Sequence, residues 1–179
     1  IHPLDSLTTS EYWVVYDALQ KAGQADGSTL FASVLLHPPS KQAVLEGRPV
    51  PRQADVVLLK GNKTFSALVN LSDKAVVSHE ELKDHQAPFV ASELFGADEP
   101  FKKDPRVVAA LKKRGLTDLR TVQCLALPVA YRSIPEQATQ RIGFGACPLN
   151  RGHHTWGRSI EGLTMTMDMV TKKVLTVSD

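Results

Sequence analysis

Residues 104–115, DPRVVAALKKRG, contain a complete set of signals for one short helix. Asp104 is a residue type that caps helix N-termini, and Pro105 takes the first helical position, where a missing N–H does no harm. Apolar residues recur at helical spacing as far as Leu111, and Gly115 stands where a left-handed C-terminal cap is expected. The sequence therefore predicts a helix that begins at Pro105 and ends before Gly115.

Four extended stretches follow this helix, at residues 121–127, 141–147, 162–169 and 173–177. The first half of the chain has the same order. Thr8 and Glu11 form a capping-box pattern, and apolar residues then recur at helical spacing up to Gly23. Extended stretches follow at residues 29–37, 54–60, 64–71 and 75–79. Each half thus predicts one helix packed on a four-stranded antiparallel sheet, which is an α+β fold.

The boundary between the halves is expected between Leu82 and Phe95, where the segment DHQAP at residues 84–88 interrupts the strand and helix patterns. A chain of 179 residues is long enough for two small domains, each with a buried core. We therefore assign residues 1–86 to a first domain and residues 87–179 to a second.

The composition, 42% hydrophobic and 22% charged, is that of a soluble globular protein. A net charge of +2 is too small to predict a nucleic-acid partner. The one basic cluster, Lys102 and Lys103 with residues 112–114, is interpreted as a solvated helix face. No membrane span is expected, because apolar runs such as residues 56–59 are far shorter than the roughly 20 residues that a span needs. No signal peptide is visible, and a start at Ile1 is compatible with a mature product.

Residue types that carry catalysis do not form a recognisable site in this sequence. The hydrolase pattern Gly-x-Ser-x-Gly is absent, so Ser159 is not a candidate nucleophile. His153 and His154 are adjacent, and neighbours on a strand point to opposite faces, so they cannot easily share one metal. Gly143 and Gly145 fall in a strand pattern, where glycine marks a bulge or a close backbone approach rather than a phosphate-binding loop.

Four short motifs occur in a fixed order along the chain: 2-HPLD-5, 38-PPSK-41, 104-DPR-106 with 113-KRGLTD-118, and 159-SIEGL-163. In this order and spacing the chain resembles the N2 and N3 domains that precede the catalytic domain of copper-containing (topaquinone) primary amine oxidases. The resemblance implies two tandem cystatin-like units, an N2-like domain at residues 1–86 and an N3-like domain at 87–179. By this resemblance, the sequence is expected to stop where the catalytic domain of that family begins.

The chemistry of that family requires a quinone made from a tyrosine in an Asn-Tyr-Asp/Glu context, beside a copper ion held by three histidines. Two of these histidines are spaced His-x-His. None of the three tyrosines here follows an Asn, and no two of the six histidines have that spacing. We therefore expect no catalytic residue, no metal ligand and no cofactor in this chain. Copper and topaquinone would belong to the parent enzyme.

The resemblance also suggests residues of a substrate channel. In the family, N3 supplies part of the wall of the channel through which amines reach the quinone, including an aromatic residue after a Pro-Pro pair. Ala87-Pro88-Phe89 matches that place with one proline missing, so Phe89 is the first candidate, with a core role as the alternative. Trp156 is a weaker second candidate. Ser159, where the family usually has proline, and the segment 130–133, AYRS, depart from the family pattern near this channel.

Cys124 and Cys147 are the only cysteines, and each lies in an expected strand. Two cysteines on adjacent strands can satisfy disulfide geometry, although a bare pair can equally stay reduced. The resemblance favours the bridge, because some amine oxidases link two neighbouring N3 strands at about these positions. An extracellular or periplasmic location is therefore expected. Asn62 and Asn70 begin glycosylation acceptor triplets, of which the one at Asn70 falls in an expected strand.

The resulting expectation is a non-catalytic N2/N3 region that acts as scaffold and substrate-channel wall. Its parent enzyme would deaminate primary amines oxidatively to aldehyde, ammonia and hydrogen peroxide, and its partner would be the catalytic domain or its homodimer. The alternative is a standalone cystatin-like module that binds another protein. If a catalytic domain normally covers part of the chain, Phe89, Val90, Tyr131 and Trp156 should be accessible and lie on one side.

Overall fold

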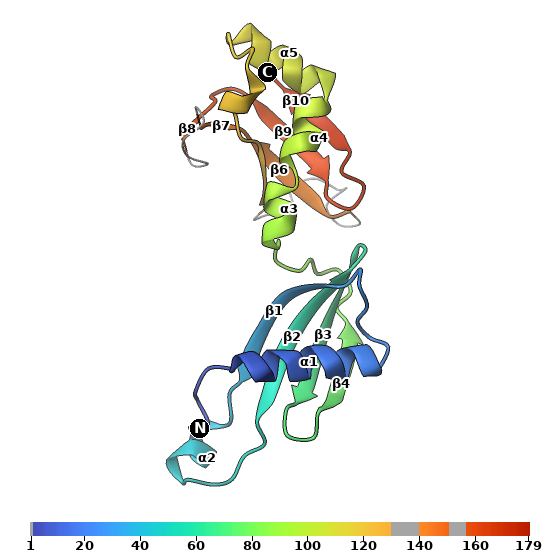
Figure 1. Cartoon of the computed structure of the whole chain (residues 1–179), viewed down its shortest axis with the longest axis vertical. Coiled ribbons are helices and arrows are strands. Elements are labelled where there is room, and N and C mark those ends of the chain that lie inside the picture. Colours follow the sequence, from blue (N-terminus) through green and yellow to red (C-terminus); the bar gives the residue numbers. More distant parts are fainter. Residues whose placement is uncertain (1, 130–139, 151–156) are drawn as a thin grey trace. The chain divides into compact units, whose positions relative to one another are not determined.

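The chain divides into two compact units, Ile1–Pro88 and Phe89–Asp179 (Figure 1). The computed structural model describes residues 2–129, 140–150 and 157–179. The sequence predicts the boundary at residues 86 and 87, and the structural division falls two residues later. No helix in the described ranges is long and apolar enough to cross a membrane.

The first unit begins with helix α1 (Thr9–Lys21), and its start has the capping box that the sequence predicts. The Glu11 N–H donates to Thr8 Oγ1 at 3.3 Å, and the Thr8 N–H donates to Glu11 Oε2 at 2.7 Å. These bonds satisfy two backbone donors at the helix start. Gly23 follows the helix with φ +70°, the left-handed conformation that glycine adopts without strain.

The sheet of the first unit contains β1 (Leu30–His37), β2 (Gln53–Lys60), β3 (Lys63–Asn70) and β4 (Ala75–Glu81), in that order and antiparallel. A two-residue turn at Gly61 and Asn62 joins β2 to β3. Helix α1 crosses one face of the sheet (Figure 1). The buried core between them includes Val15, Ala18 and Leu19 of α1 with Ala54, Val56, Leu58, Ala67 and Val69 of the sheet. A short helix, α2 (Lys41–Leu45), lies between β1 and β2 and is not predicted by the sequence pattern.

In its described residues the second unit has three α-helices where the sequence predicts one. Helices α3 (Ala91–Phe95) and α4 (Asp98–Lys103) precede α5 (Pro105–Lys113). The expectation of a single helix in this half is therefore wrong, because segments of five and six residues are too short to show a helical period. Helix α5 itself is confirmed, with Asp104 Oδ1 accepting from the Arg106 N–H at 2.9 Å and Gly115 at φ +76°.

The main sheet of the second unit has the order β10-β9-β6-β5 and is antiparallel. Its strands are β5 (Leu125–Pro128), β6 (Ile142–Ala146), β9 (Thr164–Asp168) and β10 (Val174–Ser178). The strand expected from residue 121 starts only at Leu125, because residues 119–121 form a 3₁₀ turn, η1 (Leu119–Thr121). A small second sheet pairs β7 (Pro148–Leu149) with β8 (Arg158–Ser159). Helices with antiparallel sheets in both units confirm the α+β class.

Glycines on β6 bring the helical layer close to the sheet. A Cβ added at Gly145 would lie 2.5 Å from the Phe101 ring, and one at Gly143 would lie 2.6 Å from Met169 Sδ. Real Cβ atoms do not approach heavy atoms this closely, so a side chain at Gly145 would displace the Phe101 ring and one at Gly143 would displace the Met169 side chain. The prediction of a close backbone approach at these two residues is confirmed.

Candidate functional site

Phe89, the first channel candidate, opens the second unit just before α3. Its ring lies under the guanidinium of Arg141, whose Cζ is 4.4 Å from the ring centroid. Arg141 in turn binds Glu93 of α3 through two hydrogen bonds, Nε to Oε1 at 2.6 Å and Nη2 to Oε2 at 2.8 Å. The aromatic ring, the cation and the carboxylate therefore form one packed stack.

The pair of Arg141 and Glu93 is almost completely shielded from water. The exposed fraction of the side chain is 1% for Arg141 and 7% for Glu93. Burial raises the pKa of Glu93, but the bonds from Arg141 and from the Val90 N–H outweigh it, and the pKa lies below its ordinary value. Glu93 is therefore ionised at neutral pH, and its charge compensates that of Arg141. A pair of this kind holds α3 against the start of β6.

Phe89 is partly buried and packs against the core of the second unit. Its Cε2 atom lies 3.2 Å from the position that a Cβ on Gly143 would take. The core role that the sequence left open for Phe89 is thus present, and the ring is held in one place. Val90 beside it is half-buried, whereas Trp156 and Tyr131 lie outside the described residues. The expectation that these four side chains share one accessible side stays a prediction.

Cys124 and Cys147 are joined by a disulfide, with their Cα atoms 4.1 Å apart. They lie just outside the paired strands rather than within them: Cys124 precedes β5 and Cys147 follows β6, next to the pair Leu125 and Ala146. Both are buried, with exposed fractions of 0% and 4%. The Cys124 N–H also donates to Asp98 Oδ1 at 2.7 Å, which ties the bridge to α4.

Three of the described histidines each contact a different neighbour. His37 Nδ1 is 2.9 Å from Asp55 Oδ2, His79 stacks on Phe65, and His85 Nδ1 lies 2.7 Å from the Lys83 carbonyl. Within the parts of the chain that the structure describes, no three histidine, cysteine or acidic side chains gather around a common point. The donor set of these residues therefore does not fit copper, and we assign them no step in metal chemistry. His153 and His154 are outside the described residues.

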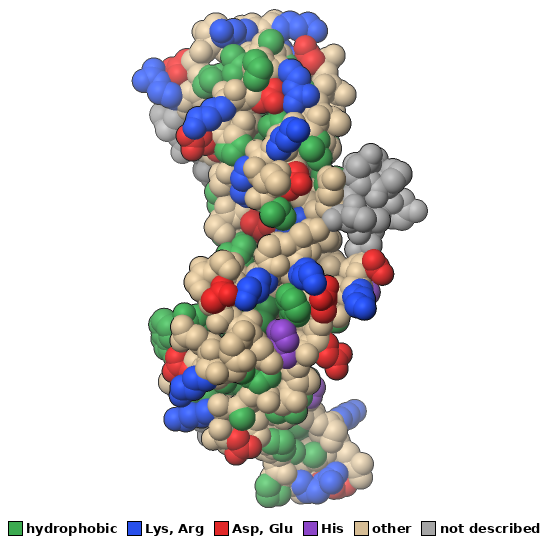
Figure 2. Space-filling view, turned by 90° about the vertical axis from the view of Figure 1, so that its right-hand side faces the viewer, with side chains coloured by type: hydrophobic (Ala, Val, Ile, Leu, Met, Phe, Trp, Pro, Cys, Tyr) green, Lys and Arg blue, Asp and Glu red, His purple; other side chains and the backbone are tan. Residues whose placement is uncertain are grey.

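The basic cluster on α4 and α5 is largely neutralised by acidic partners. Lys102 pairs with Asp98 at 2.9 Å, and Lys103 pairs with Glu99 at 2.6 Å. Lys113 and Arg114 both pair with Asp179. Figure 2 shows blue and red side chains interspersed on one face. This arrangement fits the interpretation as a solvated helix face.

Two motifs of the second unit meet at Arg114. The guanidinium donates to the Glu161 carbonyl from Nη2 at 3.2 Å and from Nε at 3.3 Å. Gly162 follows with φ +72°, and a Cβ there would come within 3.3 Å of Arg114 Nη2. The segments 113–118 and 159–163 are thus held together, beside a hollow of about 430 Å³ that Leu116 and Ile160 also line.

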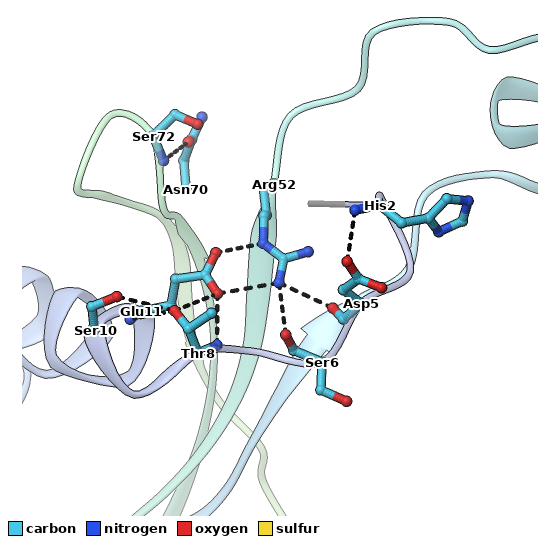
Figure 3. A network of polar contacts seen from close by, with 9 residues as sticks. All are labelled: His2, Asp5, Ser6, Thr8, Ser10, Glu11, Arg52, Asn70 and Ser72. Atoms are coloured by element: carbon cyan, nitrogen blue, oxygen red, sulfur yellow. Dashed lines mark hydrogen bonds and ion pairs between the residues drawn. The ribbon is translucent and has the colours of Figure 1, made fainter.

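The first motif, 2-HPLD-5, is organised by Arg52, which stands directly before β2 (Figure 3). Arg52 forms an ion pair with Glu11 through Nε, and its Nη2 donates to the carbonyls of Asp5 and Ser6, each at 3.0 Å. The His2 N–H donates to Asp5 Oδ2 at 2.7 Å, which closes the turn. The hydrogen bond from Arg52 is the main cause that lowers the pKa of Glu11 to about 2. The sequence assigns Glu11 only to the helix cap and gives no signal for Arg52.

Asn70 is engaged by its own turn. Its Oδ1 accepts from the Ser72 N–H at 3.0 Å, as Figure 3 shows, and its Nδ2 donates to Asp73 at 2.6 Å. The amide nitrogen that would carry a glycan is thus hydrogen-bonded in the folded chain. Asn62 is exposed at the turn between β2 and β3.

Comparison with known proteins agrees with these motifs. Residues 2–82 match the family described as copper amine oxidase, N2 domain. The chain is 28% identical over 187 residues to a primary amine oxidase of Klebsiella aerogenes, a match that covers 99% of this chain and 25% of that enzyme. A primary amine oxidase of Arthrobacter sp. (strain P1) is 39% identical over 124 residues, covering 68% of this chain and 19% of the enzyme.

A solved structure extends the likeness to the fold. The crystal structure of a copper-containing benzylamine oxidase from Hansenula polymorpha superimposes with a TM-score of 0.74 at 17% identity, covering 99% of this chain and 30% of that one. The chain spans about a quarter or less of the length of the two curated relatives. It therefore belongs to the copper amine oxidase family and corresponds to an N-terminal region of these enzymes that includes the N2 domain.

Proposed function

We propose that this chain is the non-catalytic N2 and N3 region of a copper-containing primary amine oxidase, made of two cystatin-like units. The observation that carries this proposal is the match of 99% of the chain to one quarter of an amine oxidase. The parent enzyme would convert primary amines to aldehyde, ammonia and hydrogen peroxide. Copper and topaquinone would be held by its catalytic domain, which would also be the partner of this chain.

The scaffold role is supported by how the units are braced. Ion pairs and hydrogen bonds join segments far apart in the sequence: Arg52 with Glu11, and Arg141 with Glu93. The disulfide adds a covalent link between the ends of β5 and β6. Such contacts suit domains that present fixed surfaces to a larger neighbour.

The channel role of Phe89 is supported by its fixed ring. The cation of Arg141 lies on one side, and the backbone of Gly143 lies against the ring edge. A partly buried aromatic ring held in this way can form part of a rigid wall that selects amines by size. An oxidising compartment, extracellular or periplasmic, is supported by the disulfide between two buried cysteines.

The reading frame of the gene tests the assignment as an amine oxidase region. We expect codons beyond Asp179 that encode Asn-Tyr-Asp/Glu and, after it, His-x-His. The complete product, loaded with copper, should release hydrogen peroxide from a primary amine. A natural product that ends at Asp179 would reject this assignment and favour the standalone cystatin-like binding module.

In the complete oxidase, Phe89→Leu tests the channel role. The smaller side chain should change the ratio of kcat/KM for benzylamine over methylamine by about tenfold, as is usual for reshaped apolar pockets. The matched control is Phe144→Leu on β6, whose side chain is 39% exposed. Equal changes for both amines, or the same change in the control, would reject Phe89 as a wall residue.

A further inference from the structure

We propose that a hollow in the first unit binds a carboxylate group carried on a small apolar body. The hollow has a volume of about 300 Å³ and is formed by residues of the segments 2–3, 36–39 and 47–52. It thus lies between the first motif, the end of β1 and the approach to β2. It is separate from the Phe89 stack, and the proposal does not depend on the amine oxidase assignment.

The key group is Nη1 of Arg52, which is buried and has no hydrogen-bond partner among the described residues. The other two guanidinium nitrogens are used, Nε by Glu11 and Nη2 by Glu11, Asp5 and Ser6. In Figure 3, Nη1 is the nitrogen of Arg52 without a dashed line, and it points away from Glu11. Buried donors in native proteins nearly always have an acceptor, so Nη1 is expected to bond to a water or to a ligand.

The walls of the hollow favour an acceptor that is an anion. Among the described residues, four prolines line it: Pro3, Pro39, Pro49 and Pro51. Because proline has no N–H, the hydrogen-bond donors for a ligand must come from the other residues that line the hollow. The described polar side chains that line it are the guanidinium groups of Arg48 and Arg52 and the imidazoles of His2 and His37, and none of the described lining residues is acidic.

The acids nearby are already bound to these same groups. Glu46 pairs with Arg48 at 2.7 Å, Asp55 with His37 at 2.9 Å, and Glu11 with Arg52. Hydrogen bonds from a guanidinium to a carboxylate are stronger than those to a neutral oxygen. The proline rings and Leu36 offer an apolar surface to the remainder of the ligand.

Nuclear magnetic resonance titration of the full chain at constant ionic strength tests the site, with benzoate as probe and benzamide as its neutral control. Benzoate should give saturable shifts confined to His2, His37, Arg48 and Arg52, including the Arg52 Nε–H. Benzamide should bind at least about tenfold more weakly, because it lacks the charge that strengthens the bond to the guanidinium. Absent shifts, equal binding of the two compounds, or shifts spread over all basic residues would overturn the proposal.

The variant Arg52→Lys separates the free donor from the structural ion pair. A lysine keeps a cation for Glu11 but has no second nitrogen for a ligand, so benzoate binding should weaken by about tenfold or more. Arg120→Lys is the control, since Arg120 is exposed and pairs only locally with Asp118, and it should bind benzoate as the unaltered chain does. Unchanged binding by Arg52→Lys would overturn the proposal. If that variant fails to fold in a thermal melt, the comparison of benzoate with benzamide on the unaltered chain decides alone.

Discussion

Reduction of the disulfide between Cys124 and Cys147 should destabilise the second unit alone. The bridge closes a loop with a sequence separation of 23, and the chain-entropy relation gives a stabilisation of about 3 kcal/mol for a loop of this size. For a domain of roughly 60–100 residues, each kcal/mol moves the melting temperature by about 4–8 °C. The second unit should therefore melt about 12–24 °C lower after reduction.

Hydrogen exchange followed by mass spectrometry can measure each unit separately. Because both sulfurs are buried, reduction is done in urea, followed by refolding with reductant present. Peptides from β6 and β9 should lose protection at lower temperature, and peptides from β2 and β3 should not change. The double variant Cys124→Ala with Cys147→Ala is the control for side effects of the reductant. A shift of the second unit below about 3 °C, or an equal shift of both units, would refute the reasoning.

Three further perturbations follow from the ion pairs and the helix cap. Glu93→Gln should destabilise the second unit by about 3–5 kcal/mol in urea unfolding, because it leaves the buried Arg141 charge uncompensated; Glu99→Gln, at an exposed pair, should leave the midpoint unchanged. The folded-state pKa of Glu11 is about 2 against an ordinary value of 4.5, so its contribution to the free energy of unfolding is present above pH 4.5 and is lost as pH falls toward 2. The Glu11→Gln variant should not show that loss of stability in an acid titration. Identical acid unfolding curves for the variant and the unaltered chain would contradict this prediction. Thr8→Ala should cost the first unit about 1 kcal/mol, whereas Thr9→Ala, which removes no cap, should not, and equal losses would disprove the cap.

Local signals in the sequence were sufficient for much of the fold. Helices α1 and α5 have complete caps, and the strands of both main sheets lie within a few residues of their expected positions. The sequence pattern does not predict helices α2, α3 and α4, because five or six residues span less than two helical turns and no apolar stripe can repeat. Gly96 also separates α3 from α4.

The polar networks could not be predicted because their partners are distant in the sequence. Arg52 and Glu11 are 41 residues apart, and Arg141 and Glu93 are 48 residues apart. No periodicity or spacing rule connects such positions. Cys124 and Cys147 are similarly distant, but their rarity limits the choice of partner to one.

Glu11 caps the start of α1 and also forms an ion pair with Arg52, the residue directly before β2. These two contacts together fix the position of the helix along its own axis. One carboxylate accepts from the Thr8 N–H and also from Arg52. A slide of α1 by one turn, about 5.4 Å, would move that carboxylate out of reach of Arg52 while its cap stayed intact. The helix therefore cannot shift register over the sheet without losing an ion pair, even though an apolar interface alone would tolerate nearby registers. The Glu11 side chain thus adds a specific polar contact that fixes the position of α1, which non-directional apolar packing alone would not do.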